Sequence, residues 1–228
     1  MQSAKYLVLK DLEVFRSLDK TQLDQIAFQS SFKKYGKGEF LFKPGDEISH
    51  VYIVRQGSVK SGIGVSDDKA IIKELVYQNE IIGENVMTGA KLRKEFAQAL
   101  QDTETLNIPV RFFKDLLQKN PQLCQELTFV LINKISNLEK RMNNFVFKKA
   151  QSRIVEFLKT LAKTKGIKIG LDEVLINHGL SHKEIASITE TSRQTVARVL
   201  GELKRQNIIH FSARKPNKIL IRNVMNLS

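Results

Sequence analysis

The segment at residues 180–209 constrains the fold most, because it places two short helices on either side of a tight corner. The Ser181 side chain can accept a hydrogen bond from the Glu184 N–H, and the Glu184 side chain can reach back to the Ser181 N–H. A helix is therefore predicted to begin after Ser181. Ser192 can cap a second helix that runs to about Gln206. Two capped helices with this short connection predict a helix-turn-helix.

The second helix combines an apolar face with a polar face. A buried stripe is predicted from the helical spacing of Val196, Val199, Leu200 and Leu203. The opposite face suits a DNA major groove, where arginine can pair with guanine, glutamine with adenine, and lysine with phosphate. A basic face that only contacts solvent is the alternative. The residues predicted to contact DNA in this motif are Ser181, His182, Ser192, Arg193, Gln194, Thr195, Arg198 and Lys204.

The residues after the second helix predict a β-hairpin. Residues 207–212 and 218–222 alternate or run apolar around the turn-forming sequence Ala-Arg-Lys-Pro-Asn. Arg214, Lys215 and Lys218 lie near the predicted tip, where they can contact DNA phosphates. The helix-turn-helix is therefore predicted to be winged.

The pattern S-R-x-T-V-x-R in the second helix resembles the recognition helix of the Crp/Fnr family, the regulators related to the cyclic-AMP receptor protein and Fnr. It is formed by Ser192, Arg193, Thr195, Val196 and Arg198. The resemblance implies a sequence-specific DNA-binding transcription regulator. Gln194 replaces the family's usual glutamate and cannot accept from cytosine as a carboxylate does, which can change the operator. Glu190 replaces the glycine common in the turn, where a positive φ would cost about 1 kcal/mol.

The distribution of charge favours a nucleic-acid partner. The chain of 228 residues has a formal net charge of +13. Residues 148–228 hold 16 basic and 6 acidic residues, and this excess coincides with the winged motif, which favours double-stranded DNA over an acidic protein or a membrane surface. No apolar run reaches the roughly 18 residues of a membrane span, so we expect a cytoplasmic protein with no membrane partner. Cys124 is the single cysteine, which excludes an intrachain disulfide and a four-cysteine iron–sulfur cluster.

The N-terminal half has the pattern of a β domain. From residue 31 to residue 108, short runs rich in Val, Ile, Phe and Tyr alternate with glycine-containing turns, which predicts an antiparallel β-sandwich or barrel. Residues 33–62 resemble the first half of the family's cyclic-nucleotide-binding jelly roll. Asp19 is predicted to cap a short helix before this domain, and a further helical turn is expected near residues 12–15.

Residues 79–99 resemble the family's phosphate-binding cassette, in which a Gly-Glu pair and an Arg-Ser pair hold the cyclic phosphate and ribose. Gly83 and Glu84 match the first pair, and Lys94 stands where the hydroxyl is expected. Arg93 falls near the family's arginine, although it could simply be solvated. With the two positions that contact adenine in the cyclic-AMP receptor, the implied effector pocket consists of Gly83, Glu84, Arg93, Lys94, Leu138 and Glu139.

The residues at these positions argue against cyclic AMP as the effector. Leu138 and Glu139 replace hydroxyl side chains, and a buried, unpaired carboxylate near a phosphate would cost several kcal/mol. Two alternatives remain: a different anionic or polar effector with Arg93 or Lys94 as its charge partner, or a vacant site and constitutive DNA binding. No cofactor is assigned.

Two helices are predicted to begin at Pro109 and Pro121, and the second is long. Leu123, Leu127 and Val130 form a stripe suited to packing on the barrel. A second stripe has the 4-3-4-3 spacing of a parallel coiled coil, which predicts a homodimer. Its seam consists of Leu131, Ile135, Leu138, Met142 and Phe145. One wide stripe within a monomer core is the alternative.

The predicted fold class is α+β: a cyclic-nucleotide-binding-like β jelly roll in residues 1–119, a dimerisation helix and hinge in residues 120–147, and a winged helix-turn-helix in residues 148–228. The predicted function is transcription regulation by a homodimer, with RNA polymerase as a further partner if the protein is an activator. The alternative is a protein that binds cyclic nucleotides or other small molecules without a direct DNA role. An enzyme is not expected, because the 4 histidines are scattered and form no metal-ligand cluster.

Overall fold

The computed structural model describes residues 2–64, 70–212 and 215–222. The chain forms two compact units, residues 1–137 and 138–228, and the division falls within the long helix.

The first unit begins with helical elements: α1 (Gln2–Lys10), the 3-10 turn η1 (Glu13–Phe15) and α2 (Lys20–Gln29). The prediction that Asp19 caps α2 is confirmed, because its side chain accepts from the Gln22 N–H at 2.8 Å and the Gln22 side chain accepts from the Asp19 N–H. Helix α1 was not predicted, since its sequence lacks the cap signals that identify α2.

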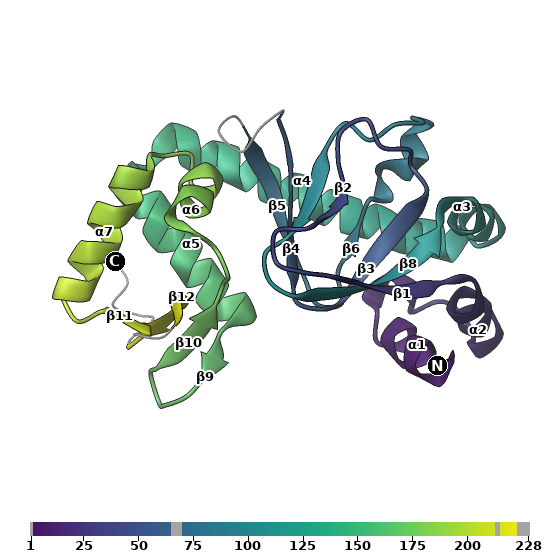
Figure 1. The fold of residues 1–228 in the computed structure, drawn as a ribbon, viewed down its shortest axis with the longest axis horizontal. Coiled ribbons are helices and arrows are strands. Elements are labelled where there is room, and N and C mark those ends of the chain that lie inside the picture. The colour runs from purple at the N-terminus through teal and green to yellow at the C-terminus, as the bar shows by residue number, and fades with distance from the viewer. Residues whose placement is uncertain (1, 65–69, 213–214, 223–228) are drawn as a thin grey trace. The chain divides into compact units, whose positions relative to one another are not determined.

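Eight described strands form two four-stranded sheets of antiparallel pairs, in the orders β1-β8-β3-β6 and β2-β7-β4-β5 (Figure 1). The predicted antiparallel β-sandwich is therefore confirmed. The strands are β1 (Ser31–Tyr35), β2 (Phe40–Phe42), β3 (His50–Gln56), β4 (Ser58–Ile63), β5 (Ile71–Tyr77), β6 (Ile81–Ile82), β7 (Phe96–Ala99) and β8 (Thr103–Pro109).

Strand β3 separates the two hydrophobic cores of this unit. Because successive side chains of a strand point to opposite faces, Tyr52 and Val54 enter the core between the sheets, whereas Val51 and Ile53 enter a core shared with the helices. The 3-10 turn η3 (Glu84–Thr88) follows β6 and carries the cassette residues.

Helices α3 (Val110–Lys119) and α4 (Pro121–Phe147) follow β8, as predicted. Leu123 and Leu127 of α4 are buried in the helix-covered core and Val130 packs against it, which confirms the first stripe. The second stripe is mostly uncovered: Leu131 is half-buried, and the other four seam residues are exposed.

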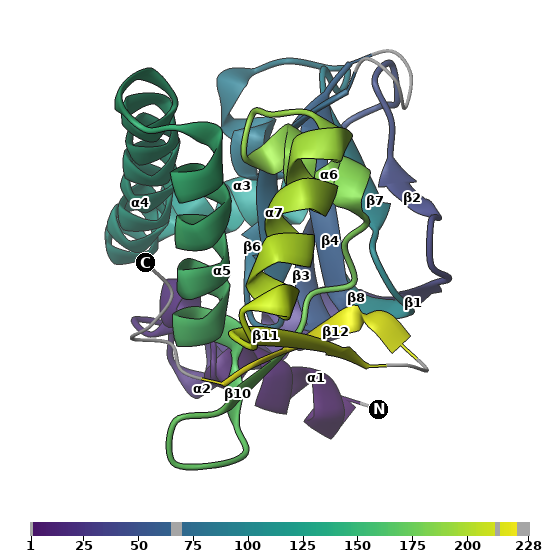
Figure 2. The same ribbon diagram turned by 90° about the vertical axis from the view of Figure 1, so that its left-hand side faces the viewer.

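The second unit contains the helix-turn-helix and a four-stranded sheet of order β11-β12-β10-β9. Helices α6 and α7 lie side by side, with the hairpin of β11 and β12 beside them (Figure 2). After the end of α4, the elements are α5 (Ala150–Lys165), β9 (Ile167–Lys168), β10 (Val174–Asn177), α6 (His182–Ile188), α7 (Arg193–Arg205), β11 (Ile209–Ser212) and β12 (Lys215–Ile221).

The hairpin differs from its prediction in one respect. Strand β12 begins at Lys215 and pairs with β10 as well as β11, so Lys218 lies within the strand opposite Asn177. The longer strand comes from the pairing with β11, in which Lys215 lies opposite Ser212 after a register shift, whereas the pairing with β10 covers only residues 218–221. Arg214 lies outside the described residues.

Candidate DNA-binding and effector sites

The start of each helix of the motif is fixed by the side chain that was predicted to cap it. The Glu184 N–H donates to Ser181 Oγ at 3.3 Å, and the Ser181 N–H donates to Glu184 Oε2 at 2.7 Å, which completes the capping box. Ser192 Oγ accepts from the Thr195 N–H at 3.0 Å. The first turn of α7 is therefore held in place where the predicted base contacts begin.

Helix α7 has the two faces that its sequence predicted. The four residues predicted to form its apolar stripe are all buried: Val196, Val199, Leu200 and Leu203. The polar face is open to solvent and exposes Arg193, Gln194, Arg198 and Lys204. An exposed row of guanidinium, amide and ammonium groups on one helix can contact both base edges and phosphates.

His178 fixes the connection between β10 and α6. The Leu180 N–H donates to His178 Nδ1 at 2.9 Å, and the imidazole is buried. Burial lowers the pKa of His178 to about 4, so the ring is neutral at pH 7. His182, a predicted DNA contact, is half-buried and lines a small cavity with His178.

The cassette arginine is enclosed by its own chain. Arg93 is 2% exposed, and its guanidinium lies 4.1 Å from the centre of the Phe42 ring. Nη1 donates to Gly83 O at 3.3 Å and Asn85 Oδ1 at 3.1 Å, and Nη2 donates to His50 O at 2.5 Å. The alternative that Arg93 is solvated is therefore wrong, because these carbonyls and the aromatic ring replace its water shell.

Gly83 is required by this arrangement for two reasons. Its φ is 86°, and a Cβ at this position would lie 2.9 Å from Arg93 Nη1. The adjacent Lys94 is exposed. Of the two neighbouring cations predicted for the pocket, Arg93 is therefore buried and Lys94 faces solvent.

Glu84 belongs to a buried ion cluster that the sequence analysis did not predict. Lys134 Nζ of α4 lies 2.6 Å from Glu84 Oε1 and 3.0 Å from Glu74 Oε2, and it also donates to Ile81 O at 3.1 Å. Burial alone would lower the pKa of Lys134, but the two carboxylates outweigh it and raise that pKa. Burial raises the pKa of Glu74, which Lys134 opposes. Glu84, the carboxylate that matches the family's Gly-Glu pair, is therefore already paired with Lys134.

A second polar network supports Arg93. Asn85, which accepts from Arg93, donates to Glu95 Oε1 at 2.9 Å, and Glu95 Oε2 lies 2.5 Å from Lys73 Nζ. Glu95 is buried, so its charge is balanced by Lys73 rather than by water. Leu138 and Glu139, the other predicted pocket residues, are exposed on α4 and belong to the second unit.

Comparisons with known proteins agree with both halves of the chain. Residues 32–120 match the cyclic nucleotide-binding domain, and residues 152–228 match the Crp-like helix-turn-helix domain. The chain belongs to the Crp/Fnr family. It is a transcription regulator with an effector-binding domain of the cyclic nucleotide-binding type and a helix-turn-helix DNA-binding domain.

Three similar proteins illustrate the breadth of this family. The chain is 28% identical over 191 residues to the global nitrogen regulator of Nostoc sp., covering 83% of this chain and 85% of that protein. It is 27% identical over 194 residues to the cAMP-activated global transcriptional regulator CRP of Pasteurella multocida, covering 85% and 91%. The fold resembles that of FixK2 from Bradyrhizobium japonicum, with a TM-score of 0.76, 21% identity, and coverage of 87% and 95%. The first two of these proteins are regulators by name.

No three His, Cys, Asp or Glu side chains in the described ranges are grouped closely enough to bind a metal. Within the same ranges, every helix is too short or too polar to traverse a bilayer.

Proposed function

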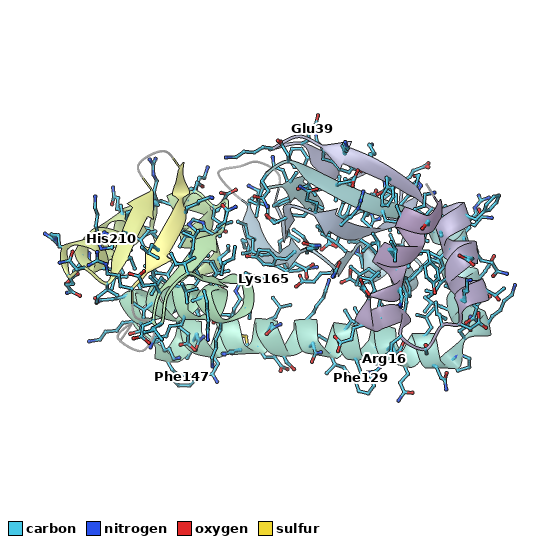
Figure 3. The ribbon with its side chains drawn as sticks, turned by 90° about the horizontal axis from the view of Figure 1, so that it is seen from below. Arg16, Glu39, Phe129, Phe147, Lys165 and His210 are labelled. Carbon is cyan, nitrogen blue, oxygen red and sulfur yellow. The ribbon has the colours of Figure 1, made fainter. Side chains whose placement is uncertain are left out.

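We propose that this Crp/Fnr-family regulator binds a near-palindromic operator as a homodimer that forms through α4. The observation that carries the proposal is the uncovered apolar seam: Ile135 is 55% exposed and Met142 is 67% exposed in the single chain. Figure 3 shows Phe129 and Phe147 also projecting outward from α4. A parallel helix pair would bury this stripe. Its two-fold symmetry would present two recognition helices about 34 Å apart, one turn of B-DNA.

Helix α7 is the element that we propose to contact the DNA bases. Arg193 and Arg198 are exposed on its polar face, and Gln194 lies beside them. Arginine is suited to guanine O6 and N7, whereas Lys204 near the far end of the helix is suited to a phosphate. Because the proposed function is action on DNA, we expect the protein in the cytoplasm, with RNA polymerase as a further partner if it activates transcription.

Replacing Arg193 with alanine tests this assignment. Arg193→Ala is expected to cost about 1 to 3 kcal/mol of specific binding and to relax one operator position, because a base contact is lost. Lys204→Ala is the matched control in the same helix: it should weaken specific and nonspecific DNA alike and lower the salt slope by about one. The measurement is fluorescence anisotropy with operator and scrambled duplexes over a salt series. Equal specificity ratios for Arg193→Ala and the wild type would contradict the assignment.

For the sensor barrel, we propose a polar effector other than cyclic AMP. The guanidinium of Arg93 and the carboxylate of Glu84 would have to exchange existing charge-assisted contacts for the phosphate and ribose of the nucleotide. Buried polar atoms without a hydrogen-bond partner occur among the described residues of the barrel, and they include Ser61 Oγ, Glu84 Oε2 and Arg93 Nε. Unsatisfied buried groups cost free energy, which favours a ligand that supplies partners over a vacant site.

Calorimetry with cyclic AMP tests this part of the proposal. We expect no binding heat at micromolar nucleotide, because the cassette cation and carboxylate are already engaged. Glu84→Ala should then leave the cyclic-AMP titration unchanged. A micromolar binding heat that Glu84→Ala abolishes, together with tighter operator binding, would show that the cassette opens for this nucleotide.

A further inference from the structure

The turn between α6 and α7 contains a residue with an unfavourable backbone conformation. Glu190 has a φ of 53°, in the left-handed region that favours glycine. A glutamate in this conformation costs folding free energy that a glycine would not cost. Its side chain is therefore expected to make a contact that a glycine could not make.

That contact is an ion pair with the C-terminal part of α4. Glu190 Oε1 lies 3.3 Å from Arg141 Nη2, and both side chains are partly buried. Partial burial weakens screening by salt and strengthens the pair relative to one on the open surface. The Arg141–Glu190 pair thus joins the turn of the DNA-binding motif to the helix that carries the proposed dimer seam.

Arg153 of α5 holds the backbone of the same turn. Its Nε donates to Thr189 O at 2.8 Å, and its Nη2 donates to Glu190 O at 2.7 Å. Its Nη1 donates to Lys148 O at 2.7 Å, in the connection between α4 and α5. The guanidinium also lies 5.2 Å from the centre of the Phe145 ring, at the end of the seam. Charge-assisted bonds to three carbonyls make this arginine a fixed bridge between the turn and the α4–α5 connection.

We infer that Glu190 is a positioning residue for DNA recognition: its ion pair with Arg141 sets the position of the helix-turn-helix relative to the C-terminal part of α4. Ser192 and Arg193, which begin the recognition helix, follow the turn directly. The inference rests on the proposed binding of DNA by a dimer, because only then does the placement of α7 against the dimer helix determine the distance between two recognition helices.

The test compares Glu190→Gly with a matched control, Asn207→Gly. Asn207 also has a positive φ, of 58°, but carries an uncharged amide and follows α7 rather than preceding it. Both substitutions relieve a backbone cost of about 1 kcal/mol, which is at least as large as the contribution of a partly exposed ion pair, so neither should lower the thermal unfolding midpoint. Glu190→Gly is expected to weaken operator binding about tenfold, a coupling of ordinary size for a contacting pair. Asn207→Gly should leave operator binding within about twofold of the wild type, because it breaks no ion pair.

A double-mutant cycle separates positioning from simple charge effects. Arg141→Ala should reproduce the loss seen in Glu190→Gly, and the double variant should lose no more than either single variant. If Glu190 acted only through repulsion of DNA phosphates, Glu190→Gly would tighten binding, Arg141→Ala would weaken it, and the two effects would add.

That additive result, or unchanged operator binding in Glu190→Gly, overturns the inference while the proposed function stands. Absence of sequence-specific binding by the wild type overturns both. Sedimentation of each variant alongside the wild type identifies any loss of binding that comes from loss of the dimer.

Discussion

Lys134→Met is expected to destabilise the N-terminal unit by about 3 to 5 kcal/mol at neutral pH, the usual cost of removing one partner from a buried ion cluster. Lys134 is the cation that both Glu84 and Glu74 contact. Methionine keeps most of the side-chain volume but leaves two mostly buried carboxylates facing each other without a counter-charge. The loss therefore comes from unpaired charge rather than from a cavity.

Urea unfolding followed by tyrosine fluorescence measures this loss of stability in the N-terminal unit. The chain has 4 tyrosines and no tryptophan, and Tyr6, Tyr35, Tyr52 and Tyr77 all lie in the first unit. Lys148→Met is the control, because Lys148 forms an exposed ion pair with Glu156 that should contribute at most about 1 kcal/mol. Equal unfolding midpoints for Lys134→Met and the wild type would mean that the cluster is not formed in solution.

The pH dependence of the same variant has a definite sign. Burial and the neighbouring Glu84 carboxylate raise the pKa of Glu74 and Lys134 opposes them, so without Lys134 this pKa should rise further above its unfolded value of about 4.3. A carboxylate with a raised folded-state pKa binds its proton more tightly when folded, so folding is favoured at low pH and disfavoured as pH rises. The stability difference between Lys134→Met and the wild type should therefore narrow as pH falls from 7 towards 5.

The helix caps could be predicted from the sequence because donor and acceptor lie within one turn of the chain. Asp19, Ser181 and Ser192 each accept from a backbone N–H three residues later, and local spacing determines that geometry. The apolar stripe of α7 was predictable for the same reason, since a helix repeats its faces every few residues. The positive φ expected at Glu190 if the turn matched the family is also observed.

The effector site could not be predicted to the same extent, because its contacts join distant segments. Arg93 donates to His50 O across 43 positions, and Lys134 reaches Glu84 across 50. Matching of short motifs identified Gly83 and Glu84 but gave no information about the side chain that pairs with Glu84. Only the packing of α4 beside β5 and β6 brings Lys134 to these carboxylates, and nothing in the spacing of α4 distinguishes it from Lys140, the other lysine of that helix.

Leu138→Glu is expected to dissociate the proposed dimer. Leu138 is 39% exposed in the single chain and lies in the middle of the seam, where the two-fold axis would place it against its counterpart in the partner. The substitution would put two carboxylates at one buried position, beside the existing Glu139 of each chain. Unpaired buried charges cost several kcal/mol each, which is a large part of the roughly 8 kcal/mol that holds a micromolar dimer together.

Sedimentation velocity at micromolar concentration should therefore show the 26.0 kDa monomer for Leu138→Glu. Ser136→Glu is the matched control, because it adds the same charge at an exposed position of α4 two residues away and off the seam. Operator affinity should fall in Leu138→Glu because the dimer is lost, since a monomer presents one recognition helix to a two-part site. It should be kept in Ser136→Glu. An undisturbed dimer in Leu138→Glu would mean that the chains associate through a different surface, and the exposed stripe of α4 would then need another partner.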